Sequence, residues 1–465
     1  MMRAVQDDPP PPVPPLGWLG ILRLGLVQTA LGAVVVLTTS AINRVMVVEL
    51  GMAAIVPGAL VGLHYAVQVL RPRMGHSSDV GGRRTPWIVG GTAVLALGGT
   101  GAAVSVAVAE AAGMAAGIAV AALAFLLIGA GIAAAGTSLL VLLAARVAPE
   151  RRAAAASLVW IMMIAGFVVT TAVAGRLLDP YSPARLVAVS VGVCVLAFLL
   201  AAAAVRGVEP VLRERAAGPV AATPPARPAF RDALRQVWAE RDARRFAVFI
   251  FVSMLGYSAQ DLVVEPFGGA VFGLTLGGTT RLASVQHAGV LLGMVGVALL
   301  GSGRRRTADP TARLRRLTVG GCIGAALGVL GLALLGLFAE PRPLAALCFA
   351  VGLGDGVFAA AAIASMMNLA GRDGEGRSGL RMGVWGASQA IAFGLGGLAG
   401  TAAVDLARLA LGAAPPLAYG LVFTADALLF LWAAALAVRV GRRPDTAGCG
   451  AAARGASAGF GANPA

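Results

Sequence analysis

The chain has 465 residues, of which 58% are hydrophobic and 13% are charged, and its formal net charge is +15 at pH 7. Soluble domains carry about 25% charged residues, so this composition excludes a soluble globular protein and indicates an integral membrane protein. All 37 basic residues are arginine, and they gather in the short segments between apolar runs. That placement argues against a nucleic acid partner and favours contact with the anionic headgroups of a bilayer.

Twelve apolar runs, each long enough for a membrane helix, follow one another along the chain. All but six of the arginines fall on one side of the membrane if the N-terminus is cytoplasmic. Positively charged loops stay in the cytoplasm, so we expect both termini there. The expected spans are residues 19–41, 52–70, 86–109, 115–145, 154–175, 184–205, 246–269, 281–301, 316–338, 343–369, 381–404 and 416–438.

The longest predicted cytoplasmic loop, residues 206–245, divides the spans into two groups of six. It contains a proline-rich stretch and then RDALRQVWAERDARRF, which favours an amphipathic helix on the membrane surface or a solvated linker helix. We therefore expect an N-terminal six-helix half over 19–205 and a C-terminal six-helix half over 246–438. Residues 1–18 and 439–465 are predicted to be disordered cytoplasmic tails.

The two expected halves have similar sequences where the first span of each one ends. The first half reads SAINRVMVVELG from Ser40 to Gly51, and the second reads SAQDLVVEPFGG from Ser258 to Gly269. Both stretches place serine and alanine before polar residues and a Val-Val-Glu. Such a repeat suits an all-α transporter fold built from a duplicated six-helix unit, and chance similarity in apolar sequence is the alternative.

A short signature, GHSSDVGGRR, lies in the loop between the second and third expected spans. It resembles the loop signature of the major facilitator superfamily, although Val80 departs from it where a cation is usual. The resemblance implies the twelve-helix facilitator fold, whereas the alternative is a basic loop that only sets topology. In the motif, glycine allows close packing and a tight turn, and aspartate can bind a helix N-terminus or an arginine. The matching residues, with an expected conformational role, are Gly75, Asp79, Gly82, Arg83 and Arg84.

The chain resembles the PucC/LhaA family over most of its length, through INRVMVVELG, SAQDLVVEPFGG, HAGVLLGM, LVWIMMIAGFVVT and WGASQAIAFGLGGLAG. This family is the bacteriochlorophyll-delivery branch of the superfamily in phototrophic bacteria. The segment from His64 to Gly91 is most similar to a subgroup whose members are often encoded among bacteriochlorophyll-synthesis genes. The resemblance implies a role in the assembly of light-harvesting antenna complexes through the handling of pigment.

Two acids in the seventh expected span lie in strongly apolar surroundings. A helix that begins near Phe246 carries Asp261 roughly 22 Å along its axis, toward the outer end. Glu265 lies about one turn beyond, on the same face. We expect Pro266 and the glycines after it to loosen or stop the helix there.

Polar residues at the outer end of the first span complete the first candidate site. These are Asn43, Arg44 and Glu49. The first and seventh spans are related by pseudosymmetry in the facilitator fold, and a charge at membrane depth needs a partner. We hypothesise that Arg44 pairs with Asp261 or Glu265 to close the outer side. The alternative is that these groups simply meet water at the membrane interface.

Histidines and amides inside the spans form the second candidate site. The magnesium of a chlorophyll accepts an axial nitrogen or oxygen ligand, and His64 and His287 occupy corresponding spans of the two halves. Neighbouring glutamines can orient an imidazole or bond a pigment carbonyl, or only link helices. Asp355 can instead bind a proton or cap a helix break. The candidates for pigment or substrate binding are His64, Gln68, Gln286, His287, Asp355, Trp385 and Gln389.

The resemblance predicts an assembly factor for photosynthetic antenna complexes in a bacterial inner membrane, either the cytoplasmic or the intracytoplasmic photosynthetic membrane. It would bind bacteriochlorophyll or a late precursor as non-catalytic cargo and deliver it within the membrane. The expected partners are the lipid bilayer, the tetrapyrrole pigment, antenna polypeptides and pigment-synthesis enzymes.

Two other functions remain open from the residues alone. One is a proton-coupled transporter of a small molecule, with Asp261, Glu265 or Asp355 carrying the proton. The other is a pigment-free scaffold that binds antenna helices. The sequence shows no nucleotide loop, no metal-ligand spacing and no nucleophile–base pair, so an enzyme is not expected.

Overall fold

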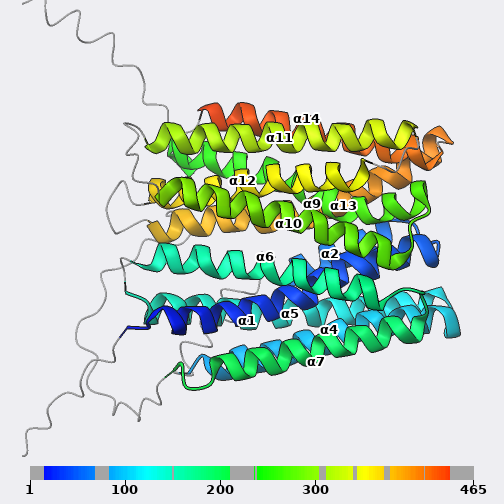
Figure 1. Cartoon of the computed structure of the whole chain (residues 1–465), viewed down its shortest axis with the longest axis horizontal. Helices are drawn as coiled ribbons and strands as arrows, with labels where there is room; N and C mark the ends of the chain where they lie inside the picture. The colour runs from blue at the N-terminus through cyan, green and yellow to red at the C-terminus, as the bar shows by residue number, and fades with distance from the viewer. Residues whose placement is uncertain are drawn as a thin grey trace, which may run out of the picture.

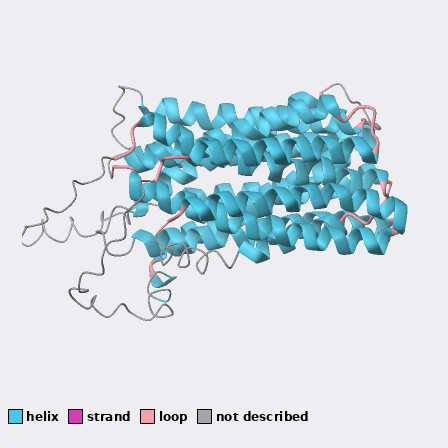
Figure 2. Ribbon diagram, turned by 90° about the horizontal axis from the view of Figure 1, so that it is seen from below, coloured by secondary structure: helices cyan, strands magenta, loops and turns pink. Residues whose placement is uncertain are grey.

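The structure is a computed structural model that describes residues 15–68, 83–148, 151–209, 235, 238–302, 310–338, 343–370, 378–412 and 414–439. Within these ranges the chain forms helices and no strand (Figure 2). Helices are expected from the composition, because lipid offers no hydrogen bonds and a helix satisfies its backbone groups within one segment. The predicted all-α fold is therefore confirmed.

The N-terminal half consists of six helices, the first of which continues into two π-helical segments, η1 and η2. Their bounds are α1 Trp18–Leu37, η1 Thr38–Ile42, η2 Val45–Glu49, α2 Ile55–Val67, α4 Thr85–Ala112, α5 Met114–Arg146, α6 Arg152–Leu177 and α7 Pro183–Val205. The C-terminal half also consists of six helices. Their bounds are α9 Arg241–Phe272, α10 Leu276–Ser302, α11 Pro310–Phe338, α12 Leu344–Ala370, α13 Ser378–Leu411 and α14 Pro415–Arg439.

Eleven of the described helices are long and apolar enough to cross a membrane, with α1, η1 and η2 counted as one. The twelfth, α2, is apolar but shorter, and the residues that follow it, 69–82, lie outside the described ranges. The helices run side by side, and α1 begins at the same end of the bundle at which α14 ends (Figure 1). We call this the terminal end, and the opposite end, on the right in Figure 1, the far end.

The first helix and α9 end further along the chain than the sequence predicted. The first helix continues past residue 41 to Glu49, because its last turns adopt π geometry instead of ending. The expectation that Pro266 and the glycines after it could stop α9 is wrong, since α9 continues to Phe272. A proline removes only one N–H from a helix whose other bonds persist, which membrane helices tolerate. The helix ends instead at Gly273, whose φ of 64° is the left-handed conformation that glycine adopts readily.

Each half buries its own apolar core. One core is built from side chains between Ile21 and Val208, and the other from side chains between Ala243 and Ala437. Leu262 and Leu276 belong to the C-terminal half but pack into the first core. The two halves lie side by side, the N-terminal one below and the C-terminal one above in Figure 1. The predicted tails and the predicted linker helix fall almost wholly outside the described residues.

Two seams join the halves, one between α2 and α13 and the other between α6 and α10. Glycine lets the helices approach each other closely at both seams. A Cβ added at Gly58 of α2 would collide with the side chain of Thr401 on α13. A Cβ added at Gly277 of α10 would collide with the Gly175 carbonyl and the Asp179 carboxylate. Small residues at such crossings let helix backbones approach each other in a membrane, where dispersion and hydrogen bonds drive association.

Candidate functional site

The first helix changes from α to π geometry at Thr38, and this change positions the polar residues at its far end. The hydroxyl of Thr38 donates to the Val35 carbonyl at 2.7 Å, and that of Thr39 donates to the same carbonyl at 3.2 Å. Such bonds compete with backbone N–H groups for helical carbonyls, which favours a wider turn. Single π turns inside α-helices occur frequently at functional sites. Here η1 and η2 both pack against α9.

Arg44 is buried at the far end, with 3% of its side chain exposed. Its guanidinium pairs with Glu49, and its Nη2 donates to the Leu274 carbonyl of the C-terminal half at 2.8 Å. The structure therefore pairs Arg44 with Glu49, and not with Asp261 or Glu265 as hypothesised. The reason is the π geometry, which sets residues five apart in sequence one above the other on the same helix face.

Two further residues of the first candidate site lie where the far end of the first helix meets α9 and α10. Asn43 Nδ2 donates to the Leu262 carbonyl at 2.9 Å. Glu265 is 3% exposed and lies beside the hydroxyls of Ser40 and Thr280, within electrostatic reach of Arg44. Both Arg44 and Glu265 are thus enclosed between the halves, which disagrees with the alternative that they only meet water at the interface.

Asp261 and His287 lie near each other on α9 and α10. Asp261 is partly exposed, and it is within electrostatic reach of His287. His287 is 4% exposed, and its Nδ1 is 2.8 Å from the Ala283 carbonyl. Its ring meets Phe167 of α6 edge-on, with 5.1 Å between the ring centroids. His287 therefore lies at the α6–α10 seam, where it joins an acid of α9 to an aromatic side chain of the other half.

His64 lies at the other seam, on α2. It is 3% exposed, and Gln68 Nε2 donates to its Nε2 at 2.9 Å. The next residue, Tyr65, packs against Phe393 of α13 with 5.4 Å between ring centroids, and Tyr257 of α9 packs against the same phenyl ring at 5.6 Å. These three aromatic side chains are partly exposed, so they form an aromatic wall at the α2–α13 seam.

The other predicted binding residues do not join one cluster. Trp385 is buried, and its indole donates to the Ala243 carbonyl near the terminal end of α9 at 3.2 Å. Asp355 instead contacts Gln260, which lies roughly 25 Å further along α9. Gln389 Nε2 contacts the Met254 sulfur at 4.0 Å. Gln286, 5% exposed on α10, meets α12 where Gly352 allows close approach.

The loop motif is only partly described, since Gly75, Asp79 and Gly82 lie outside the described residues. Beside the motif's Arg84, the N-terminus of α4 binds Glu209, an acid that sequence reasoning missed. The Glu209 carboxylate accepts from the backbone N–H of Arg84 at 2.9 Å and from the N–H and hydroxyl of Thr85 at 2.8 Å. Burial raises the pKa of Glu209, but these hydrogen bonds outweigh it and hold the pKa below its usual value.

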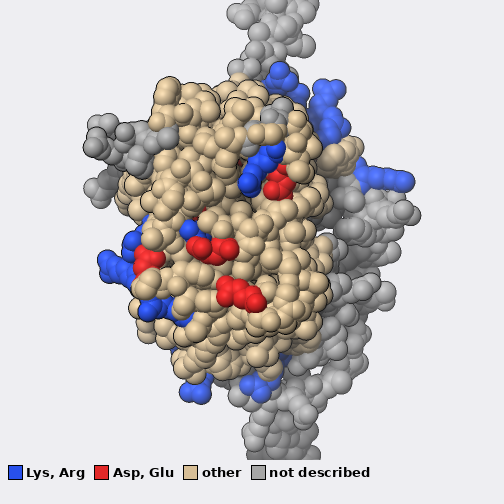
Figure 3. Space-filling view, turned by 90° about the vertical axis from the view of Figure 1, so that its right-hand side faces the viewer, with Lys and Arg blue, Asp and Glu red and all other residues tan. Residues whose placement is uncertain are grey.

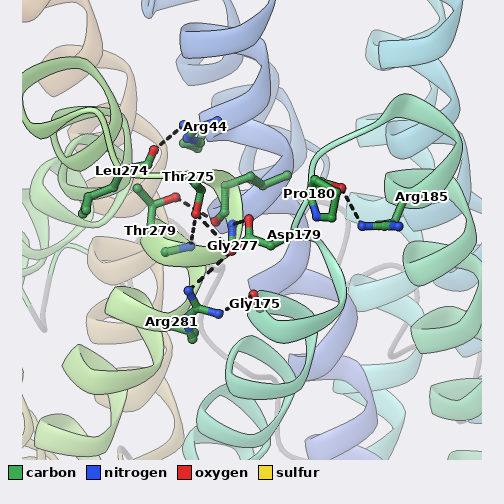
Figure 4. A network of polar contacts seen from close by, with 12 residues as sticks. Arg44, Gly175, Asp179, Pro180, Arg185, Leu274, Thr275, Gly277, Thr279 and Arg281 are labelled. Carbon is green, nitrogen blue, oxygen red and sulfur yellow. Dashed lines mark hydrogen bonds and ion pairs between the residues drawn. The ribbon is translucent and has the colours of Figure 1, made fainter.

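A second acid that sequence reasoning missed joins the halves at the far end (Figure 4). Asp179, just beyond α6, accepts from the Gly277 N–H at 2.9 Å and from the Thr275 hydroxyl at 3.0 Å, both in the C-terminal half. Arg281 of α10 reaches the same carboxylate at 3.4 Å and also donates to the Gly175 carbonyl at 3.2 Å. Asp179 therefore caps the N-terminus of α10 from the other half.

A third acid that sequence reasoning missed makes an equivalent contact at the α2–α13 seam. Asp405 of α13 accepts from the N–H of Ala54 at 3.0 Å and from the N–H of Ile55 at 2.7 Å, at the start of α2. By position in their halves α2 corresponds to α10, and α6 corresponds to α13. Each half thus supplies one carboxylate that caps the second helix of the other half. No local sequence motif identifies these acids as caps, because their partners are distant in sequence.

These contacts make the far end the closed end of the described bundle. Figure 3 looks onto it and shows acidic side chains across the middle of the face, with arginines among them and at its edges. The polar contacts that cross between the halves here come from Asn43, Arg44, Asp179, Arg281 and Asp405. At this end the described polar contacts hold the two halves together.

Comparison with known proteins gives close relatives over nearly the whole chain. A family model described as "PUCC protein" matches residues 41–444. The "Bacteriochlorophyll synthase 44.5 kDa chain" of Rhodobacter capsulatus is 48% identical over 428 residues, which cover 91% of this chain and 96% of that protein. "Protein PucC" of the same organism is 33% identical over 451 residues, which cover 91% of this chain and 92% of the relative.

Solved structures share the fold at low sequence identity. A bacterial homologue of the human lysosomal transporter Spinster, inward-facing and unoccupied, has a TM-score of 0.61 at 14% identity, covering 90% of this chain and 96% of that one. A proton-dependent oligopeptide transporter has a TM-score of 0.62 at 14% identity, covering 90% and 98%. These likenesses confirm the predicted facilitator architecture of two six-helix halves.

Proposed function

Because the chain belongs to the PUCC protein family, we propose that it acts in the biogenesis of photosynthetic pigment–protein complexes. The observation that carries this proposal is its 48% identity, over nearly its whole length, to a protein named for bacteriochlorophyll synthesis. In finer detail, we propose that the chain binds bacteriochlorophyll or a late precursor and delivers it to antenna polypeptides within a bacterial membrane, with both termini cytoplasmic.

We further propose that the chain is a carrier and not an enzyme, although the relative's name contains the word synthase. Its apolar helices and its transporter fold suit the movement of an apolar molecule. A bacteriochlorophyll is a broad, flat and apolar molecule that is more soluble in lipid than in water. We propose that it passes sideways, through a seam between the halves, because it dissolves in the surrounding lipid.

Both seams carry features that a flat macrocycle can use. The aromatic wall of Tyr65, Tyr257 and Phe393 offers ring faces for stacking at the α2–α13 seam. At the α6–α10 seam, His287 has its Nδ1 held by a backbone carbonyl. Such a bond leaves Nε2 as the ring nitrogen that could bind a metal. His64 has its Nε2 occupied by Gln68, so we favour His287 as the axial ligand of the pigment magnesium.

An absorption spectrum tests this proposal. The protein is purified in mild detergent from a phototrophic host that lacks antenna polypeptides, as wild type and as His287→Leu and His64→Leu. We expect a stoichiometric tetrapyrrole band in the wild type, its loss or a shift of its red absorption maximum in His287→Leu, and little change in His64→Leu.

The control for folding is the elution volume of each variant in size-exclusion chromatography. A folded but colourless wild-type protein would overturn pigment carriage. If that colourless protein co-purified with antenna polypeptides from a host that makes them, a scaffold function would replace it.

A second candidate function is proton-coupled transport of a small molecule. The observation that favours it is the line of acids Glu265, Asp261 and Asp355, in which successive members interact electrostatically inside the C-terminal half. Uptake of protons by proteoliposomes, driven by an added substrate and lost in Asp261→Asn, would support this function over pigment delivery.

A further inference from the structure

Asp355 is a carboxyl group enclosed in the C-terminal half, with 0% of the residue exposed. Glycines on both sides of it let α12 pack tightly against its neighbours. Gly354 lies against the backbone of α11, and Gly352 and Gly356 lie against the backbone of α10. Asp355 is directed at α9, where its Oδ2 accepts a hydrogen bond from Gln260 Nε2.

Each of these two side chains also has a buried oxygen atom without a hydrogen-bond partner. Gln260 is also 0% exposed, and its Oε1 has no hydrogen-bond partner. Asp355 Oδ1 has none either. Both atoms are acceptors, so neither can satisfy the other. An unpaired buried acceptor is costly, and a buried carboxylate without a counter-charge is costlier still.

The groups around Asp355 do not supply a counter-charge. Those described within its electrostatic reach are Asp261 and Tyr257 on α9, Cys322 on α11 and Asp426 on α14. Each of them is acidic or neutral. A negative charge on Asp355 would therefore be unpaired inside the bundle, where even an isolated neutral acid is more stable than the ion.

A proton on Asp355 would give both unpaired oxygen atoms a hydrogen-bond partner. A carboxylic acid and a primary amide form a planar pair with two hydrogen bonds, in which the acid O–H donates to the amide oxygen and the amide N–H donates to the acid carbonyl. The second of these bonds is already present between Gln260 and Asp355. A proton on Oδ1 would supply the first and would satisfy both unmatched oxygens.

We propose that Asp355 and Gln260 form a proton-binding site within the membrane, occupied by one proton in this conformation. Asp261 is the group that exchanges the proton, because it interacts with Asp355 and is itself partly exposed. In the exchange, the Asp355 acid loses its proton to the Asp261 carboxylate, and the reverse step restores it. The inference does not depend on pigment binding, and it identifies the site that proton coupling would use.

Infrared spectroscopy of the purified full-length protein tests the site. We expect the wild type to show a protonated carboxylic acid carbonyl band at neutral pH that is absent from Asp355→Asn. Asparagine keeps two hydrogen bonds to Gln260, so this variant should fold. The matched control is Asp426→Asn, which removes another buried acid of the same half and should leave the Asp355 band in place.

Two further variants separate proton binding from a merely structural role. Gln260→Leu should shift the acid band to higher frequency, because the carboxyl group loses its amide partner. Asp261→Asn should slow the exchange of the acid hydrogen for deuterium. The proposal is overturned if Asp355→Asn removes carboxylate bands and no acid band, or if the acid band is unmoved in Gln260→Leu.

Discussion

At the scale of single residues, the structure replaces a predicted contact with one that the helix geometry imposes. Arg44 was expected to pair across the halves, but π turns bring Glu49 beneath it on the same helix. Arg44 still joins the halves, through the Leu274 carbonyl. The ion pair therefore holds a buried guanidinium in place so that it can bond the backbone of α10's leading loop.

Glu49→Gln should lower the stability of the folded protein by about 1–3 kcal/mol, because it leaves the buried Arg44 charge without its carboxylate. Thermal unfolding in detergent measures the loss. The control is Glu110→Gln, which removes an exposed acid at the same end of the bundle. Equal melting temperatures for Glu49→Gln and the wild type would show that the ion pair contributes nothing.

At the scale of elements, three helices have N-termini bound by carboxylates from elsewhere in the chain. Glu209 binds the start of α4, Asp179 the start of α10 and Asp405 the start of α2. In each case the acid accepts backbone N–H groups that have no partner within the helix, and its charge complements the helix dipole. The Glu209 contact stays within the N-terminal half, whereas the other two join the halves.

The Glu209 cap should make stability depend on pH. The pKa of Glu209 is lower in the folded protein than in the unfolded chain. The stabilisation that the Glu209 carboxylate gives to the folded protein is therefore complete above the unfolded-state pKa. It is lost as the pH falls through the folded-state pKa. Melting temperatures of wild type and Glu209→Gln, measured from neutral to acidic pH, should differ at neutral pH and converge in acid. A constant difference over that range would contradict the assignment.

At the scale of the whole molecule, two apolar cores, the first of which also holds Leu262 and Leu276 of the other half, meet along two glycine-lined seams. Paired carboxylate caps join the halves at the far end. The caps are related by the pseudosymmetry of the halves. Each is a small set of polar bonds rather than an apolar interface. Polar groups can bind water when they separate, which suits contacts that break and re-form as the halves move.

The double variant Asp179→Ala and Asp405→Ala should open the far end, because it removes both caps at a cost of about 1 kcal/mol each. Spin labels at Glu110→Cys and Leu409→Cys, on exposed sites of the two halves, report the separation by double electron–electron resonance. We expect a longer or broader distance distribution in the double variant.

The matched control for that experiment is Arg185→Gln, since Arg185 bonds the Pro180 carbonyl within its own half (Figure 4). Its distance distribution should equal that of the wild type. If the double variant also kept the wild-type distribution, the caps would not be what closes the far end.

The sequence alone determined the membrane location, the twelve apolar helices and the family, because each depends on local composition or on motifs read in order. It also singled out Arg44, Asp261, Glu265 and Asp355, since a charge in an apolar segment stands out without knowledge of the fold. Only the tertiary structure decided their partners, such as Glu49 for Arg44 and Gln260 for Asp355. Only the structure identified Asp179 and Asp405 as helix caps. Acids are common at helix ends, and the sequence does not show that a helix of the other half begins beside them.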